Sequence, residues 1–160
     1  ENSVDRLEQV EFCQMRPINT VNGWTMVRNF NTAREKDSIC LLPLSNERAF
    51  RKWLYAIGEC GLALCSGVPV MQAMYSCYLR NGQPSNSAKS VQMQSGMMML
   101  RRTLDSKTAS ITTDARAGFM LAWNVTPDEQ VCLEEYYSGL VLHYSEDTSD
   151  NFLTITSSPL

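Results

Sequence analysis

Two short runs of strand-favouring residues open the chain, and a pair of turn-forming residues separates them. The runs lie within residues 9–28 and flank Asn22-Gly23. An Asn-Gly pair tolerates the positive φ angles of a type I′ turn, which makes it a strong hairpin signal. Pro17 interrupts the alternation of the first run and suits a bend or an edge strand. The pattern therefore predicts a long first strand, a bend near Pro17 and then a tight hairpin.

Beyond this hairpin the apolar residues recur at helical spacing. The clearest helical pattern begins after a Ser45 cap and ends at Ser66-Gly67. Pro69 then marks the first turn of a helix that runs to about Arg80. The other predicted elements are a short turn capped by Thr32, a helix with apolar Met93, Met97, Leu100 and Leu104, a helix capped by Thr112 or Thr113, a helix from Thr126-Pro127 to about Ser138, and a short strand over Leu140–Tyr144.

Strands and helices do not alternate along the chain, which argues against a doubly wound sheet. The pattern predicts an α+β fold that is mostly α, in which a β-hairpin is followed by an antiparallel bundle of about five helices. Gly58 and Gly61 lie inside the first long helix and destabilise it by about 1 kcal/mol each relative to alanine. A helix accepts this cost where another backbone packs closely, so we expect a close contact there.

Two groups of residues are candidates for the core. We expect Phe12, Trp24 and Trp53 to pack the hairpin on the first long helix, so that Trp24→Ala would cost about 3–5 kcal/mol. A stripe of Met and Tyr side chains on the next helix is more typical of a core than of a binding groove. The stripe comprises Val70, Met71, Met74, Tyr75 and Tyr78.

The cysteines do not follow the spacing of a metal site. They lie at positions 13, 40, 60, 65, 77 and 132, and the chain has a single histidine, His143. Zinc needs about four ligands at close paired spacing, so we expect neither a metal site nor a disulfide framework. Most cysteines are interpreted as small core residues, and a reducing, intracellular setting fits them. No apolar run is long enough to span a membrane.

The charged residues are unevenly distributed. The net charge is −3, yet all fourteen Lys and Arg lie at or before Arg116. Residues 117–160 contain Asp and Glu but neither Lys nor Arg. A basic body with an acidic end is typical of a protein that contacts a polyanion through its basic part only. Charge by itself also fits a solvated surface without a nucleic-acid partner.

No complete active site is apparent from the motifs. The sequence contains neither a phosphate-binding P-loop nor a dinucleotide fingerprint. A catalytic triad would depend on His143 alone. Asp128-Glu129 and Glu134-Glu135 share one predicted helix, where helix-dipole complementation and a solvated face explain them better than metal binding does.

Several blocks of sequence resemble one family of enzymes. The first set resembles the final palm motif of RNA-dependent RNA polymerases of positive-strand RNA viruses, in its tombusvirus-like and nodavirus-like form: Val10-Glu11-Phe12-Cys13-Gln14, Pro17, Gly23-Trp24, Met26-Val27-Arg28-Asn29 and Lys36-Asp37. The second set resembles the helical thumb of the same polymerases: residues 56–64, 66–70, 80–82 and 125–130. The similarity covers about residues 8–138.

The resemblance implies an organisation and a set of site residues. Residues 1–30 would be the end of the palm with its primer-grip hairpin, residues 31–144 the helical thumb, and residues 145–160 a polar tail. The grip holds the 3′ end of the nascent strand, and such phosphate contacts position a strand without reading its sequence. The residues implied in RNA contact are Phe12, Cys13 and Gln14 at the grip, Arg16 beside it, and Arg28, Arg34 and Lys36 as further cations.

The resemblance also implies what the chain lacks. The family's chemistry uses two metal ions, Mg or Mn, held by aspartates that stabilise the attacking and leaving oxygens. The Gly-Asp-Asp turn and the other catalytic motifs do not occur in this sequence. We therefore expect one part of a polymerase, starting just after those motifs, that binds no cofactor and is inactive alone. The implied partners are template and nascent RNA, the upstream palm and fingers and, in the complete enzyme, nucleoside triphosphates, all in the host cytoplasm.

Two other interpretations remain open at this point. The chain could be a stand-alone helical protein-interaction module without RNA binding, whose Met and Tyr stripe meets a partner. It could also be a different enzyme with its site between hairpin and helices. A single basic stripe over residues 48–107 that runs toward Arg16, Arg28 and Lys36 would favour the polymerase, whereas scattered charges would favour the module.

Overall fold

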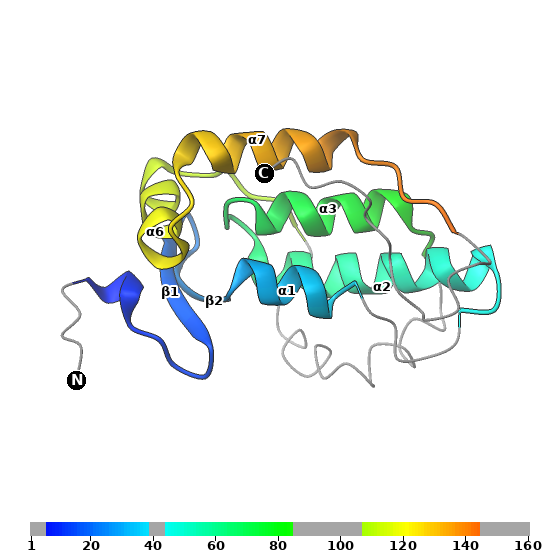
Figure 1. Cartoon of the computed structure of the whole chain (residues 1–160), viewed down its shortest axis with the longest axis horizontal. Helices are drawn as coiled ribbons and strands as arrows, with labels where there is room; N and C mark the ends of the chain where they lie inside the picture. Colours follow the sequence, from blue (N-terminus) through cyan, green and yellow to red (C-terminus); the bar gives the residue numbers. More distant parts are fainter. Residues whose placement is uncertain (1–5, 39–43, 85–106, 145–160) are drawn as a thin grey trace.

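The computed structural model describes residues 6–38, 44–84 and 107–144 (Figure 1). Over these residues the chain forms a two-stranded antiparallel hairpin followed by five α-helices, which confirms the predicted α+β class. In chain order the elements are the 3₁₀ helix η1 (Leu7–Gln9), β1 (Met15–Thr20), β2 (Gly23–Arg28), α1 (Phe30–Lys36), α2 (Glu47–Cys65), α3 (Met71–Asn81), α6 (Thr113–Trp123) and α7 (Pro127–Gly139). The helix predicted around residues 93–104 and the tail predicted at 145–160 lie outside the described residues.

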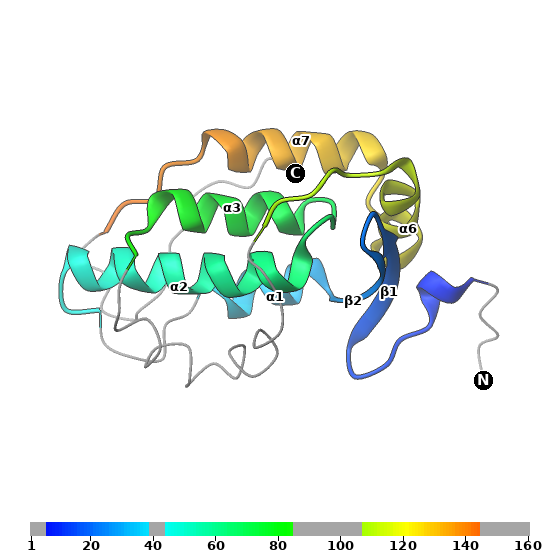
Figure 2. The same ribbon diagram turned by 180° about the vertical axis from the view of Figure 1, so that it is seen from behind.

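The helices form a layer with the hairpin at one end. Helix α3 lies between α2 and α7, as both views of the ribbon show (Figures 1 and 2). Helices α2 and α3 run antiparallel, whereas α3 and α7 run in the same direction. Helix α6 crosses the end of this layer and packs against β1 and η1. The hairpin is thus attached to the bundle chiefly through α6.

Two glycines of α2 allow α3 to approach closely. A Cβ atom on Gly58 would lie 2.5 Å from the backbone nitrogen of Leu79, and one on Gly61 would lie 2.0 Å from the ring of Tyr75. The close helix–helix contact expected at these glycines is therefore confirmed. The stripe of α3 is core, as predicted, because all its members are buried: Val70, Met71, Met74, Tyr75 and Tyr78.

Asparagine side chains cap the first two helices. Asn46 caps α2 by accepting a hydrogen bond from the Ala49 N–H at 2.8 Å, so the predicted Ser45 cap is wrong by one residue. Asn29 caps α1, and the predicted Thr32 cap is wrong, because Thr32 already lies in the helix and donates its own N–H to Asn29. Asn, Ser and Thr side chains can all accept hydrogen bonds from the free N–H groups of a helix's first turn. Local sequence alone therefore does not decide which of several such residues close together is the cap.

Helix α3 begins later than predicted. Pro69 precedes the helix rather than lying in its first turn, because residues 65–68 form the turn that follows α2. In this turn the Val68 N–H donates a hydrogen bond to the Cys65 carbonyl. Val70 occupies the N-cap position with a φ of 65°.

The last two helices begin as the sequence indicates. Thr112 caps α6 through its side chain, and Thr126 forms a capping box with Glu129 at the start of α7. Pro127 occupies the first turn of α7, where its missing N–H costs nothing. The short strand predicted over residues 140–144 is wrong, because this segment follows α7 as irregular chain.

The turn that joins the two strands differs from the prediction. Thr20 pairs with Gly23, so the two loop residues are Val21 and Asn22. Gly23 alone of the Asn-Gly pair has a positive φ, at 98°. The Thr20 hydroxyl accepts a hydrogen bond from the Asn22 N–H at 3.1 Å and donates one to the Gly23 carbonyl at 3.0 Å. These bonds close a turn in which Gly23 is the only residue with left-handed backbone. The predicted type I′ turn at Asn22-Gly23 is therefore wrong, since such a turn needs a positive φ at both residues.

A second tight turn lies where one long strand was predicted. Phe12 and Met15 exchange both backbone hydrogen bonds, at 2.9 and 3.0 Å. The two residues between them, Cys13 and Gln14, have φ angles of 52° and 63°. Positive φ at both central residues is the geometry of a type I′ turn, here built without glycine. The first strand is therefore short, and the chain reverses immediately before β1.

The hairpin does not pack on the helices through Trp24. Trp24 is 54% exposed and Phe12 is 71% exposed, although Trp53 is buried at 3%. The expectation that these three rings form one contact is wrong. Ile18 and Val27 face the bundle instead, because neighbouring positions on a strand point to opposite faces and Val27 lies out of phase with Trp24.

Three of the cysteines are small core residues, as predicted. Cys60, Cys65 and Cys77 are buried free thiols, and burial raises the pKa of Cys65 to about 12. Cys13 and Cys132 are exposed, so the core interpretation does not hold for these two.

Candidate functional site

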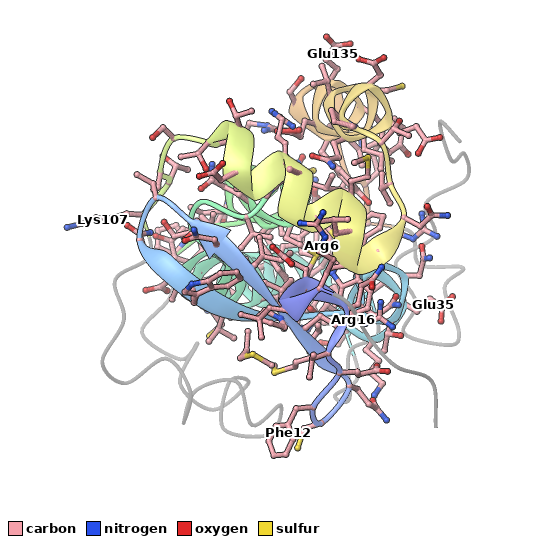
Figure 3. The ribbon with its side chains drawn as sticks, turned by 90° about the vertical axis from the view of Figure 1, so that its left-hand side faces the viewer. Arg6, Phe12, Arg16, Glu35, Lys107 and Glu135 are labelled. Atoms are coloured by element: carbon pink, nitrogen blue, oxygen red, sulfur yellow. The ribbon has the colours of Figure 1, made fainter. Side chains whose placement is uncertain are left out.

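The exposed turn at residues 12–14, which directly precedes β1, is called the tip below. Phe12 is at the far end of the molecule from Glu135 on α7 (Figure 3). The tip holds two non-glycine residues, Cys13 and Gln14, in left-handed backbone. Such backbone is unfavourable for most residues and persists where the surrounding structure imposes it. The tip therefore presents an apolar ring, a thiol and an amide on a defined and unusual backbone.

Arg16 anchors the hairpin to the end of α6. Its Nη1 donates a hydrogen bond to the Ala122 carbonyl, and its guanidinium carbon lies 4.9 Å from the centre of the Trp123 ring. The Glu11 carboxylate is 4.0 Å away. A cation suits this position because the last carbonyls of a helix carry partial negative charge. The structure thus brings Arg16 together with protein groups.

Arg28 lies in a buried polar cluster with Asp37 and Tyr75. Its Nη2 lies 2.7 Å from Asp37 Oδ2 and 3.0 Å from the Tyr75 hydroxyl oxygen. The Tyr75 hydroxyl also donates a hydrogen bond to Asp37. The Asp37 side chain is 7% exposed and that of Arg28 is 28% exposed. We name these three residues the Arg28 cluster.

The electrostatics of the Arg28 cluster follow from burial and charge. Burial lowers the pKa of Arg28, but the oxygens of Tyr75 and Asp37 outweigh this effect and the net shift is upward. Burial, with the charge of Asp37, raises the pKa of Tyr75 well above its usual value. Arg28 is therefore a fixed cation and Tyr75 a neutral hydroxyl, so the cluster holds one ion pair bridged by one neutral donor.

Sequence reasoning missed the roles of Asp37 and Tyr75. Asp37 belongs to the Lys36-Asp37 block on which the polymerase resemblance rests, and Tyr75 was interpreted as a simple core residue. An acid near the end of one helix and a buried hydroxyl on another gave no local signal of a shared partner. Only the fold brings them to Arg28.

The remaining two predicted cations lie on α1. Arg34 is half-buried, with its guanidinium carbon 5.3 Å from the centre of the Phe30 ring. Lys36 is exposed in the last turn of the same helix. The structure does not bring these side chains into the Arg28 cluster. Their role as RNA contacts stays a prediction.

The basic stripe predicted over residues 48–107 stays untested, because three of its members, Lys89, Arg101 and Arg102, lie outside the described residues. Two of its described members serve packing. Arg51 Nη1 donates to the carbonyls of Asn81 and Leu142, at 2.9 and 2.8 Å. Arg80 Nη2 donates to the Tyr137 carbonyl at 2.8 Å.

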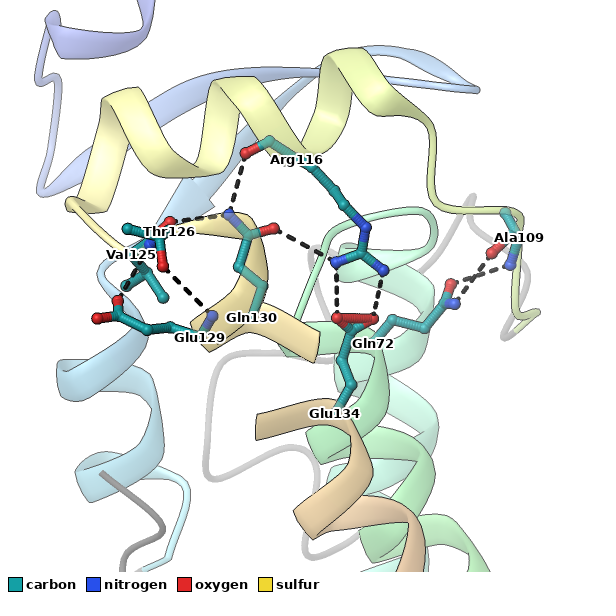
Figure 4. A network of polar contacts seen from close by, with 8 residues as sticks. All are labelled: Gln72, Ala109, Arg116, Val125, Thr126, Glu129, Gln130 and Glu134. Atoms are coloured by element: carbon teal, nitrogen blue, oxygen red, sulfur yellow. Dashed lines mark hydrogen bonds and ion pairs between the residues drawn. The ribbon is translucent and has the colours of Figure 1, made fainter. Parts of the chain in front are cut away.

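The acidic pairs of α7 are partly structural (Figure 4). Glu129 completes the capping box, which agrees with the dipole interpretation. Glu134 does not lie on a freely solvated face, because it accepts hydrogen bonds from both terminal nitrogens of Arg116, at 2.8 and 3.2 Å. In the described part of the chain no group of three or more His, Cys, Asp or Glu residues could hold a metal ion. Among the described helices none is long and apolar enough to cross a membrane.

Comparison with known proteins decides the family. A family model described as viral RNA-dependent RNA polymerase matches residues 1–145. The chain belongs to this family of viral polymerases. The family predicted from residues 10–14 and the blocks that follow them is therefore confirmed.

Curated viral polymerases align with most of this chain. It is 42% identical to the RNA-directed RNA polymerase of Turnip crinkle virus, 41% identical to that of Maize chlorotic mottle virus (isolate United States/Kansas/1987) and 38% identical to that of Melon necrotic spot virus. The alignments cover 92%, 87% and 90% of this chain, but only 20%, 14% and 19% of the respective polymerases. No solved structure matches the chain at a significant level.

Membership of the polymerase family favours the first of the three interpretations over the stand-alone module. The chain corresponds to a fifth or less of the length of these polymerases. Its tip at residues 12–14 belongs to the block on which the resemblance to the family first rested.

Proposed function

We propose that this chain is the RNA-gripping part of a viral RNA-directed RNA polymerase. In this proposal Phe12, Cys13 and Gln14 contact the backbone at the 3′ end of the nascent strand, and Arg34 and Lys36 add positive charge. The observation that carries the proposal is an exposed tip whose two non-glycine residues, Cys13 and Gln14, have left-handed backbone in a member of a polymerase family. Backbone in this unfavourable conformation is concentrated at functional sites.

The chemistry of the tip suits a nucleic-acid strand. Phe12 is 71% exposed and offers a ring face on which a base or sugar can pack. The Gln14 amide can donate its N–H groups to a phosphate or ribose oxygen, and its carbonyl can accept a hydrogen bond from a ribose hydroxyl. None of these groups reads base identity by a fixed pattern, so the grip suits a strand of any sequence.

The charges of the chain support the direction of approach. Glu135, an exposed acid of α7, lies at the opposite end of the molecule from Phe12 (Figure 3). A polyanion is repelled from this carboxylate, which leaves the side of the molecule that carries the tip for its approach.

The catalytic step belongs elsewhere in the complete enzyme under this proposal. Mg or Mn ions would be held by the aspartates of the family's catalytic motifs, and among the described residues no group of three or more His, Cys, Asp or Glu could hold a metal ion. The partners are then template and nascent RNA, nucleoside triphosphates, and the palm and fingers of the same polymerase. The place of action is the host cytoplasm, and the chain alone does not polymerise.

RNA binding over a salt series tests this proposal in the complete polymerase that carries the chain. We expect Phe12→Ala and Gln14→Ala to weaken binding of a primer–template RNA without changing the slope of log affinity against log salt. Lys36→Gln is expected to reduce that slope by about one, because one phosphate contact is lost. Glu135→Gln, on the opposite side, is the control and is expected to leave binding nearly unchanged.

Unchanged RNA affinity in all three variants would refute the grip. The tip would then be a part of the polymerase that does not contact RNA. A uniform loss of affinity in Glu135→Gln as well would also count against the proposed direction of approach.

A further inference from the structure

The Arg28 cluster lies at the base of the tip. Arg28 is the strand partner of Met15, and Met15 directly follows Gln14. Met15 also shares both backbone hydrogen bonds with Phe12 across the tip turn. A displacement of Arg28 is therefore passed to the tip through one strand pair and one turn.

The cluster ties this strand pair to two helices. Asp37 is the C-cap of α1 and Tyr75 lies in the middle of α3, and both residues are buried, at 6% and 1% exposure. Asp37 and Tyr75 have no exposed position from which they could touch a large polyanion. Their polar atoms are instead used on Arg28 and on each other.

Arg16 holds the base of the tip from the other face of the hairpin. It is the strand partner of Val27, one residue along from the Met15–Arg28 pair, so its side chain leaves the opposite face. Its guanidinium is attached to the end of α6 at Ala122 and Trp123. The two arginines therefore connect the base of the tip to α6 through Arg16 and to Asp37 and Tyr75 through Arg28.

We propose that Asp37 and Tyr75 are positioning residues of the polymerase, which hold Arg28 and thereby set the place of the tip at residues 12–14. Arg28 is then an anchor of the hairpin rather than a contact to RNA phosphate. This inference rests on the proposed function of the tip. It adds two residues, Asp37 and Tyr75, that support the grip without touching RNA.

Amide hydrogen exchange tests the positioning step without RNA. Tyr75→Phe removes the hydroxyl that bonds Arg28 and Asp37 but keeps the buried ring. In the complete polymerase, this variant is expected to speed exchange over residues 10–16 by about fivefold and to leave α7 unchanged. Tyr144→Phe is the matched control, since it deletes a hydroxyl that donates to the Leu44 carbonyl at 3.0 Å, away from the hairpin. Unchanged exchange at residues 10–16 in Tyr75→Phe would overturn the inference.

RNA binding by the same polymerase distinguishes an anchor from a phosphate contact. Tyr75→Phe and Asp37→Asn are expected to weaken primer–template binding about fivefold with the salt slope unchanged. The effect of Tyr75→Phe is expected to disappear when Gln14→Ala is already present, because both act through the tip. Additive effects would overturn the inference. A slope reduced by about one in Arg28→Gln would also overturn it, because Arg28 would then contact phosphate directly.

Failure of this inference differs from failure of the proposed function. If Phe12→Ala and Gln14→Ala weaken RNA binding but Tyr75→Phe does not, the tip grips RNA and the Arg28 cluster does not position it. If the tip variants themselves have no effect, the grip fails, whereas faster exchange over residues 10–16 in Tyr75→Phe still shows that the cluster holds the tip.

Discussion

Single residues of the hairpin divide between those that hold it and those that face outward. Ile18 and Val27 are buried against the bundle, and Arg16 and Arg28 bond protein groups on opposite faces. Trp24 is on the outward face and is 54% exposed. Residue type alone would rank the tryptophan as the main anchor. The observed burial gives that role to smaller aliphatic residues and to two arginines.

Trp24→Ala is expected to reduce the free energy of unfolding by less than about 1 kcal/mol, because little apolar area is removed from a buried site. Trp53→Ala, at a position that is 3% exposed, is expected to cost about 3–5 kcal/mol. Urea unfolding of the chain followed by circular dichroism measures both. Equal losses for the two tryptophans would contradict the observed orientation of β2.

At the scale of elements, the contacts between helices are fixed by close approach of their backbones and by buried polar side chains. Gly58 and Gly61 set the α2–α3 contact. Gln130 joins α6 to α7, because its fully buried amide donates to the carbonyls of Arg116 and Val125, at 3.0 and 2.9 Å (Figure 4). A buried amide is stable only when its bonds are made, so this joint specifies one arrangement of the two helices.

Gly61→Ala is expected to destabilise the chain by at least about 2 kcal/mol, because the new methyl group overlaps the ring of Tyr75 and must displace α3. Gly139→Ala is the matched control at the end of α7, where no atom beyond the adjoining residues and the backbone of the helix itself lies within 4 Å of the new Cβ. It is expected to raise stability by about 0.5 kcal/mol through the entropy of the unfolded chain. The midpoint of urea unfolding checks both, and a neutral Gly61→Ala would mean that the helices can separate freely.

At the scale of the whole molecule, tyrosines of α3 and α7 share one interior. Tyr75, Tyr78 and Tyr137 are all at most 2% exposed. Burial raises the pKa of each, to about 12 for Tyr137. Neutral hydroxyls are therefore part of the packed state, and the fold disfavours their ionisation.

The raised pKa values of these buried tyrosines predict how the free energy of unfolding changes at alkaline pH. The unfolded chain releases tyrosine protons near pH 10, whereas the folded chain keeps that of Tyr137 until about pH 12. The unfolded state binds fewer protons in this window, so the free energy of unfolding falls as pH rises, by about 1.4 kcal/mol per pH unit for each such tyrosine. Urea unfolding between about pH 10 and pH 12 measures the slope, and Tyr137→Phe is expected to reduce it. Constant stability over this range would contradict the raised pKa values.

The sequence predicted the local features of the fold well because near neighbours encode them. Periodic apolar residues gave the helices, and the Thr126 capping box gave the start of α7. The candidate tip at residues 12–14 was also found from the sequence, through its resemblance to a polymerase motif. The positions of the two turns were less predictable. Hydrogen bonds of the Thr20 side chain place one turn at Val21-Asn22 instead of Asn22-Gly23, and a type I′ turn forms at Cys13-Gln14 although neither residue is a glycine.

The sequence by itself determined the fold class, the polymerase family and most of the described element types, since these depend on short-range pattern and on matching motifs. Tertiary structure alone decided which face of β2 is buried and which groups hold the arginines. Arg28 meets Tyr75 across 47 residues and Arg16 meets Ala122 across 106. Partners so distant along the chain leave no local pattern, because the free energy that pairs them comes from the packing of the whole core.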